Sequence, residues 1–178
     1  MRYTLVMTLM ALGCAGPSAA QQFVTREAHI SFLSETPIED IRAESHEASA
    51  VFAVDGQVAF QVPILSFRFP KALMEEHFNE NYMESEQFPR AAFRGMVSGF
   101  DAQREGTQEV TASGTLTMHG VDVERTISGT LTRVEVGWRI EATFEVPCED
   151  HDIDIPKVVS ENIAEVIEVT LSATLLPR

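Results

Sequence analysis

The chain has 178 residues, of which 44% are hydrophobic and 22% charged, and its formal net charge at pH 7 is −14. This length is enough for one domain with a sizeable hydrophobic core. The acidic balance repels nucleic acid phosphates and anionic lipid headgroups, so we expect no nucleic acid partner and attribute the charge to solubility.

The first twenty residues are predicted to be a signal peptide. Arg2 supplies a positive start, residues 5–14 form an apolar run too short to span a bilayer, and residues 18–20 are Ser-Ala-Ala. We expect cleavage after residue 20, which leaves residues 21–178 as the mature domain. No later stretch is apolar enough for a membrane helix. The prediction is a periplasmic or secreted protein.

A lipoprotein anchor is the alternative for the same segment. Cys14 follows Leu12 and Gly13, as lipidated cysteines do, but Ala11 is a poor fit three residues before it. Signal-peptide cleavage therefore remains the preferred prediction. It would remove Cys14 and leave Cys148 without a partner for an intramolecular disulfide. As a lone thiol near a strand end, Cys148 is expected to act as a small buried hydrophobe.

Apolar and polar residues alternate with period two along most of the mature chain, which is typical of half-buried strands. Asp55-Gly56 and His119-Gly120 are turn signals between such segments. We expect an all-β fold of about eight strands in up-and-down order, which suits a closed antiparallel barrel. The residues predicted to share the inner face are Ala28, Ile30, Phe32, Ala48, Ala50, Phe52, Val54, Val58, Phe60, Val62, Ile64, Ala91, Phe93, Gly95, Val97, Val110, Ala112, Gly114, Leu116, Met118, Ile127, Gly129, Leu131, Trp138, Ile140, Ala142, Phe144, Val146, Ile167, Val169, Leu171, Ala173 and Leu175.

One segment, residues 70–83, interrupts this alternation, and we call it the helical insert. Pro70 suits a first helical turn, and apolar residues follow at helical spacing. A short amphipathic helix between strands can close the mouth of a barrel. We expect its apolar side chains to point into the barrel and its acidic ones to face water; these are Leu73, Met74 and Phe78, and Glu75, Glu76 and Glu80 respectively.

Small residues recur on the predicted inner face, where a filled barrel would carry large ones. Several together would leave a cavity, and no charged residue shares these faces, so the cavity would be apolar. Alternatively, small residues relieve crowding where strands coil tightly or pack against the helix. The residues concerned are Ala48, Ala50, Ala91, Gly95, Ala112, Gly114, Gly129, Ala142 and Ala173.

Three sequence blocks resemble the YceI-like family of exported lipid- and polyisoprenoid-binding proteins. They are HFNENYMESEQFPRAAFRG, GTLTMHGVDVERTISGTLT and IDIPKVVSENIAEVIEVTLSATL, and the resemblance extends from Phe32 to about Leu176. It implies an extended lipocalin-like antiparallel barrel that holds an isoprenoid chain, and a periplasmic location. The residue pattern itself indicates only a hydrophobic chain, either polyisoprenoid or fatty-acyl.

We therefore expect a carrier, storage or scavenging protein without enzymatic activity or cofactor, and leave its oligomeric state open, a dimer included. The alternative is a redox or enzymatic accessory that acts on or presents an isoprenoid quinone-like lipid. The absence of a nucleophile–base motif counts against hydrolysis but not against presentation. The predicted ligand-binding residues are Leu73, Met74, Phe78, Ala91, Phe93, Leu116, Met118, Leu131, Trp138, Ile140, Phe144 and Leu171.

Polar residues near these segments have more than one interpretation. His119 fits a turn-stabilising role better than a headgroup contact. His77 could meet a polar headgroup at the mouth or be solvated. Arg68, Arg90 and Arg94 could bind a diphosphate, although acidic neighbours are commoner partners. Neither residues 75–77 nor the acidic residues around His151 show a paired ligand spacing, so we predict no metal site.

Overall fold

The computed structural model describes residues 20–156 and 163–178. The predicted signal peptide lies outside these residues except for Ala20, and so does Cys14, the alternative site of lipidation. Predictions about that segment therefore stay as predictions.

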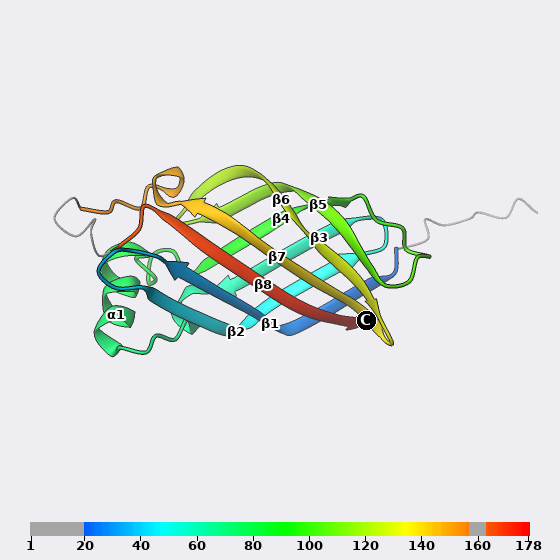
Figure 1. The fold of residues 1–178 in the computed structure, drawn as a ribbon, viewed down its shortest axis with the longest axis horizontal. Coiled ribbons are helices and arrows are strands. Elements are labelled where there is room, and N and C mark those ends of the chain that lie inside the picture. The colour runs from blue at the N-terminus through cyan, green and yellow to red at the C-terminus, as the bar shows by residue number, and fades with distance from the viewer. Residues whose placement is uncertain (1–19, 157–162) are drawn as a thin grey trace, which may run out of the picture.

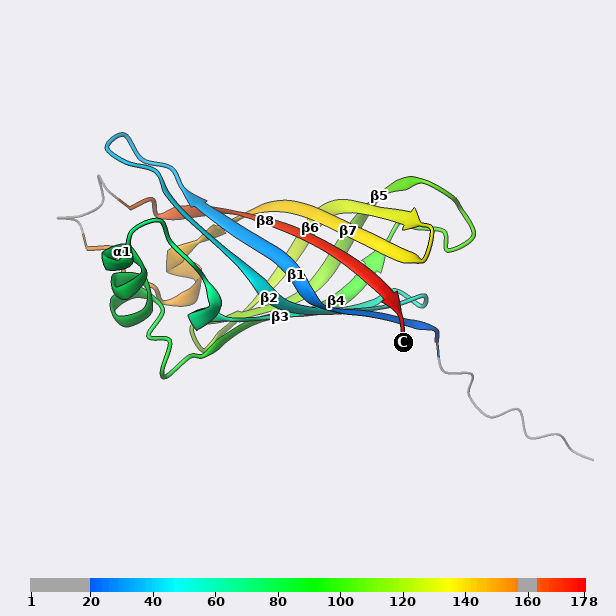
Figure 2. The ribbon, with the colours of Figure 1, turned by 90° about the horizontal axis from the view of Figure 1, so that it is seen from below.

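Within the described residues, eight antiparallel strands form a closed barrel in the order in which they occur in the sequence. The predicted all-β barrel is thus confirmed. Figure 1 shows the strands running obliquely along an elongated molecule, and Figure 2 shows α1 at one end with the C-terminus toward the other. The strands are β1 (Gln22–Ser34), β2 (Ile41–Ala53), β3 (Gln57–Pro63), β4 (Arg90–Ser98), β5 (Thr107–Met118), β6 (Val121–Val134), β7 (Gly137–Pro147) and β8 (Val166–Pro177).

Two predicted turns lie where expected. Gly56, with φ of +96°, lies in the turn between β2 and β3. His119 and Gly120 both have positive φ, at 51° and 77°, and join β5 directly to β6. Two-residue hairpins favour this left-handed backbone because its twist matches that of the strands.

β1 closes the barrel by pairing with both β2 and β8. Its register with β2 is irregular on both sides of Ala28. Ala28 pairs with Ala48, whereas Ile30 pairs with Ser45, so two steps along β1 match three along β2. Such a β-bulge bends the strand and increases its twist.

β2 begins at Ile41, earlier than the alternation starting at Ala48 indicates. Its inward residues here, Ala43 and Ser45, are buried but small or polar, so they give no hydrophobic signal. The Ser45 hydroxyl forms a 2.6 Å hydrogen bond with that of Ser66, in the short helix η1 (Ile64–Ser66). This bond satisfies a polar pair that burial would otherwise destabilise.

The helical insert contains α1 (Ala72–His77) followed by the π-helical turn η2 (Phe78–Tyr82). The predicted helix is confirmed, but two of its side chains, those of Leu73 and Glu75, are not placed as predicted. Leu73, expected to point into the barrel, is 61% exposed. Glu75 is half-buried rather than fully solvated: it lies 3.2 Å from the Arg68 guanidinium and accepts a hydrogen bond from the Phe69 amide.

At the end away from α1, the interior of the barrel is filled by aromatic side chains. There the Trp138 ring makes edge contacts with three phenylalanine rings, at centroid distances of 6.4, 5.8 and 6.5 Å. Trp138 is fully buried. We call Phe23, Phe52, Phe100 and Trp138 the aromatic plug.

At two inward positions that face each other, backbone crowding rather than a cavity explains the small residue. Gly95 and Gly114 face each other across β4 and β5. A Cβ on Gly114 would lie 2.1 Å from the Arg94 carbonyl oxygen, and one on Gly95 would lie 2.4 Å from that of Ser113. Only glycine permits this close approach.

Candidate binding site: an apolar cavity beneath the helical insert

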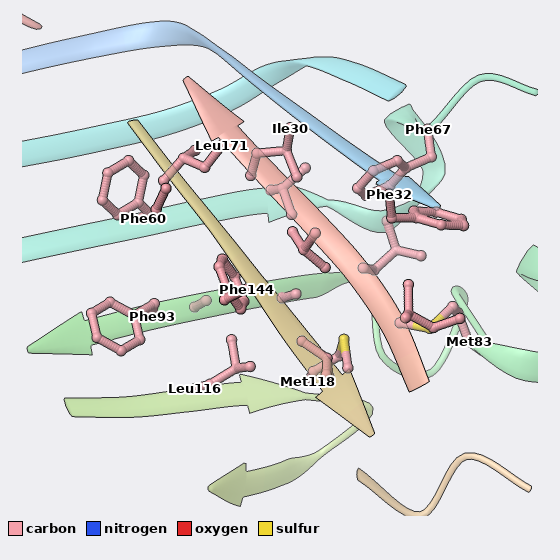
Figure 3. Close-up of a pocket in the computed structure, with 18 of the residues that line it drawn as sticks. Ile30, Phe32, Phe60, Phe67, Met83, Phe93, Leu116, Met118, Phe144 and Leu171 are labelled. Atoms are coloured by element: carbon pink, nitrogen blue, oxygen red, sulfur yellow. The ribbon is translucent and has the colours of Figure 1, made fainter. Parts of the chain in front are cut away.

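An internal cavity of about 290 Å³ occupies the barrel between the aromatic plug and the helical insert. Its lining is almost entirely hydrophobic and comes from all eight strands as well as from the insert. Figure 3 shows side chains from opposite walls pointing toward a shared space, with Phe60 and Phe93 toward one end and Phe32, Phe67 and Met83 toward the other. The expected apolar cavity is therefore present.

Small residues open this space. Ala91, Ala112 and Ala142 line the cavity, each where a larger side chain would fill it. Gly129 lines it too, but a Cβ there would lie 2.5 Å from the Glu141 carbonyl oxygen, so the backbone requires glycine at this position. Ala48, Ala50 and Ala173 are buried but do not line it. The small inward residues thus divide between the two explanations that the sequence left open.

Most of the residues predicted to bind a ligand do line the cavity. Their strands and the insert bring them to one continuous apolar surface. They are Met74, Phe78, Ala91, Phe93, Leu116, Met118, Ile140, Phe144 and Leu171.

Three predicted ligand-binding residues lie elsewhere. Leu73 is exposed on the outer side of α1. Leu131 and Trp138 do face the barrel interior, as the period-two alternation predicts. They are packed in the filled core, however, and do not line the cavity. Alternation identifies the face of a strand, whereas position along the barrel axis decides whether an inward residue meets the cavity.

The sequence prediction missed a group of aromatic residues at the α1 end. Phe67 and Phe69 precede the insert and line the cavity together with Tyr82 and Met83. The Phe78 ring lies 5.8 Å from Phe67 and 5.0 Å from Phe69 between centroids. The alternation of Phe67 and Phe69 just before Pro70 is the signal that could have indicated them.

The charged groups near the α1 end are directed to protein partners or to solvent. Arg68 pairs with Glu75 and also donates to the Leu65 carbonyl at 3.0 Å. Arg90 and Arg94 are exposed on β4. Among the described residues that line the cavity, none is a lysine or an arginine. The three arginines are therefore poorly placed for the diphosphate role considered from the sequence.

Cys148 lines the cavity and is buried. Burial raises the pKa of this thiol to about 11, and the negative charge of Glu165 contributes further. The thiol thus stays protonated at neutral pH, and a protonated thiol is a weak nucleophile.

His119 and His151 form a structural pair beside the β5–β6 turn. The His119 Nδ1 lies 3.0 Å from the His151 carbonyl oxygen, and its ring packs against Phe88. His151 is fully buried in η3 (Cys148–His151), and burial lowers its pKa. These contacts support the turn-stabilising role predicted for His119.

Within the part of the chain that the structure describes, no helix is both long and apolar enough to cross a membrane.

A closed eight-stranded antiparallel barrel with an apolar cavity is a lipocalin-like architecture, just wide enough to hold side chains or one small ligand. The family model of the YceI-like domain matches residues 22–175, and the chain belongs to this family. A search of curated proteins found no match to the sequence.

Solved structures from three bacteria share the fold. A polyisoprenoid binding domain from Saccharophagus degradans, implicated in plant cell wall breakdown, aligns with a TM-score of 0.76 at 12% identity, over 89% of this chain and 99% of that one. BcnA from Burkholderia cenocepacia gives 0.70 at 13% identity, over 83% and 94%. The YCEI protein of Campylobacter jejuni gives 0.62 at 13% identity, over 100% and 98%.

Proposed function

We propose that this protein binds a hydrophobic chain, a polyisoprenoid or a related lipid, in the barrel cavity and acts as a carrier, storage or scavenging protein in the cell envelope. The observation that carries the proposal is the apolar cavity itself, whose hydrophobic lining extends from Phe93 and Val97 to the helical insert. Moving a hydrocarbon from water into such a site supplies about 0.8 kcal/mol per methylene.

The size of the cavity favours one chain over several. At about 290 Å³, it lies just below the range of about 300–1,000 Å³ for small-molecule sites. The shared fold with the polyisoprenoid binding domain of Saccharophagus degradans supports an isoprenoid over a fatty-acyl chain.

The charge distribution favours a ligand with a neutral or weakly polar headgroup. The described lining contains no lysine or arginine, and its polar members at the α1 end include His77 and Tyr82. A diphosphate would need bidentate cations that this lining does not provide.

The alternative function, an accessory that acts on or presents an isoprenoid quinone-like lipid, uses the same cavity. A covalent reaction would need a nucleophile, and the raised pKa of Cys148 makes that thiol a poor one. Presentation of an unreacted lipid needs no nucleophile and stays compatible with the geometry.

Two measurements test the carrier proposal. Organic extraction of the purified protein followed by mass spectrometry should recover one lipid class, whereas recovery of a substrate together with its conversion product would favour the alternative. A fluorescent isoprenoid analogue should then bind the delipidated protein with an affinity nearly independent of salt, because no ion pair contributes. Affinity that falls steeply with salt, or no saturable binding at all, would refute binding in the cavity.

A further inference from the structure

Two histidines and a glutamate meet on the outer surface of the barrel, away from the cavity. His29 belongs to β1, and Glu44 and His46 belong to β2. Ala28 and Ser45 are buried, so the neighbouring His29, Glu44 and His46 are directed to the opposite, outer face. Glu44 and His46 are exposed, and His29 is partly exposed.

The β-bulge brings these residues together. Two steps along β1 between Ala28 and Ile30 match three along β2, which places His29 beside His46. The two imidazole rings stack with centroids 4.5 Å apart and an interplanar angle of 18°. His29 Nε2 lies 3.1 Å from Glu44 Oε2.

The cluster is held by regular backbone structure rather than by a loop. Glu44 exchanges two backbone hydrogen bonds with Arg68, at 3.2 and 2.8 Å. The Arg68 guanidinium pairs with Glu75, which leaves the Glu44 carboxylate directed at His29. Sites built on strands keep their ligands in a defined geometry.

The potential ligand atoms of all three side chains lie within 4.8 Å of one another. Donors bound to one tetrahedral zinc ion lie about 2.0–2.2 Å from it, and so about 3.3–3.6 Å from one another. To bind one ion, the side chains would rotate about their χ angles, and the two imidazole rings would leave their stacked arrangement so that their in-plane lone pairs converge.

We propose that His29, Glu44 and His46 form a binding site for a divalent transition-metal ion of the zinc or copper class. Imidazole nitrogen suits such ions, whereas calcium and magnesium prefer oxygen ligands. Coordination through His29 Nε2 would need that nitrogen to carry no proton, with the proton of the neutral ring on Nδ1. Three protein ligands leave a coordination position for water or for a group from another molecule.

This site is separate from the proposed lipid site, because it lies on the outer face of strands whose inner face lines the cavity. The sequence prediction of no metal site rested on spacing within short segments. His29 and Glu44 are fifteen residues apart in the sequence, and only the bulged pairing of β1 with β2 joins them.

The test is calorimetric titration of the untagged, chelator-treated protein with Zn²⁺ and, separately, Cu²⁺. We expect one ion per chain, with an affinity lowered at least about 10- to 100-fold in His29→Ala and in His46→Ala. Glu44→Gln should also weaken binding, whereas Glu145→Gln, at an exposed carboxylate on β7, should bind as the unmodified protein does. Circular dichroism confirms that each variant is folded.

Electron paramagnetic resonance of the Cu²⁺ complex gives a second readout. Nitrogen hyperfine structure from two imidazoles is expected for the unmodified protein and from one imidazole in either histidine variant. The proposal is overturned if the unmodified protein binds neither ion, or if both histidine variants keep its affinity and spectrum. Equal weakening by Glu145→Gln would also overturn it, since binding would then be diffuse attraction to an acidic surface.

Discussion

Phe78 of η2 stacks on Phe32 of β1, with ring centroids 5.4 Å apart and an interplanar angle of 26°. This contact connects the helical insert to the barrel wall at the end where the cavity lies. Phe67 and Phe69 extend the contact on either side. The insert is therefore anchored by aromatic packing on residues that also line the cavity.

Replacing Phe78 by alanine should loosen this anchor. We expect a loss of about 3 kcal/mol in the free energy of unfolding, the low end for phenylalanine because Phe78 is only partly buried. Ligand dissociation should also become faster, since a cover controls exit more than capture. Chemical denaturation and stopped-flow release of a fluorescent lipid measure the two effects.

The matched control, Leu73→Ala, removes an exposed side chain of α1 and should change stability by no more than about 0.5 kcal/mol. An unchanged release rate in Phe78→Ala would mean that the insert is a structural element only.

Filling the cavity should abolish lipid binding while leaving the barrel folded. Ala91 on β4 lines the cavity, so Ala91→Phe places a ring in the space for the ligand. The empty volume absorbs most of the added side chain, and we expect a stability change within the range of about 1–3 kcal/mol seen for overpacking. Ala59→Phe, at a position on β3 that does not line the cavity, is the control and should still bind. If Ala91→Phe binds lipid normally, the ligand lies outside the cavity.

Trp138, the single tryptophan, should be insensitive to the ligand. The period-two alternation alone predicts that Trp138 contacts the ligand and that its fluorescence emission shifts on binding. The structure instead places Trp138 in the aromatic plug. We therefore expect the emission maximum to stay constant during lipid titration and to move to longer wavelength on unfolding, when the buried indole meets water. A spectral change at saturating lipid in the folded protein would mean that the ligand reaches the plug.

The Cys148 thiol should react slowly in the folded protein. With its pKa raised from 9.0 to about 11, the thiolate fraction at pH 8 falls about 100-fold, and alkylation follows the thiolate. The alkylation rate should keep rising with pH up to about 11, whereas the unfolded chain should level off near 9. Lipid in the cavity should slow the reaction further, because Cys148 is part of the lining. Peptide mass spectrometry follows Cys148 separately from Cys14. Equal rates in the folded and unfolded chains would place the thiol in water.

The barrel was predictable from sequence because period-two alternation directly reports which residues share a face. The sequence carries no comparable signal for how far along the barrel axis an inward residue lies. Ile140 and Trp138 share one face of β7, yet one lines the cavity and the other fills the plug. Helical spacing is similarly limited. Leu73 and Phe78 are five residues apart, about 140° around a helix of 3.6 residues per turn, so they cannot share a face as Met74 and Phe78 do.

Features that depend on strand pairing were beyond the sequence pattern. The start of β2 carries buried Ala43 and Ser45, which give no apolar alternation. The meeting of His29 with Glu44 and His46 requires the bulge, and no local motif in the sequence indicates its position. Pairing register is set by the whole barrel, whereas motif spacing is read within one segment.

The aromatic plug makes the cavity a tube with one blind end. Trp138, Phe52 and Leu175 are completely buried there, so a chain bound in the cavity as proposed would have its tip toward the plug and its other end beneath the helical insert. Entry and departure of that chain would then both take place at the end covered by the helical insert, in opposite directions. A membrane or protein that donates the molecule and one that receives it would have to meet the same end of the barrel, one after the other.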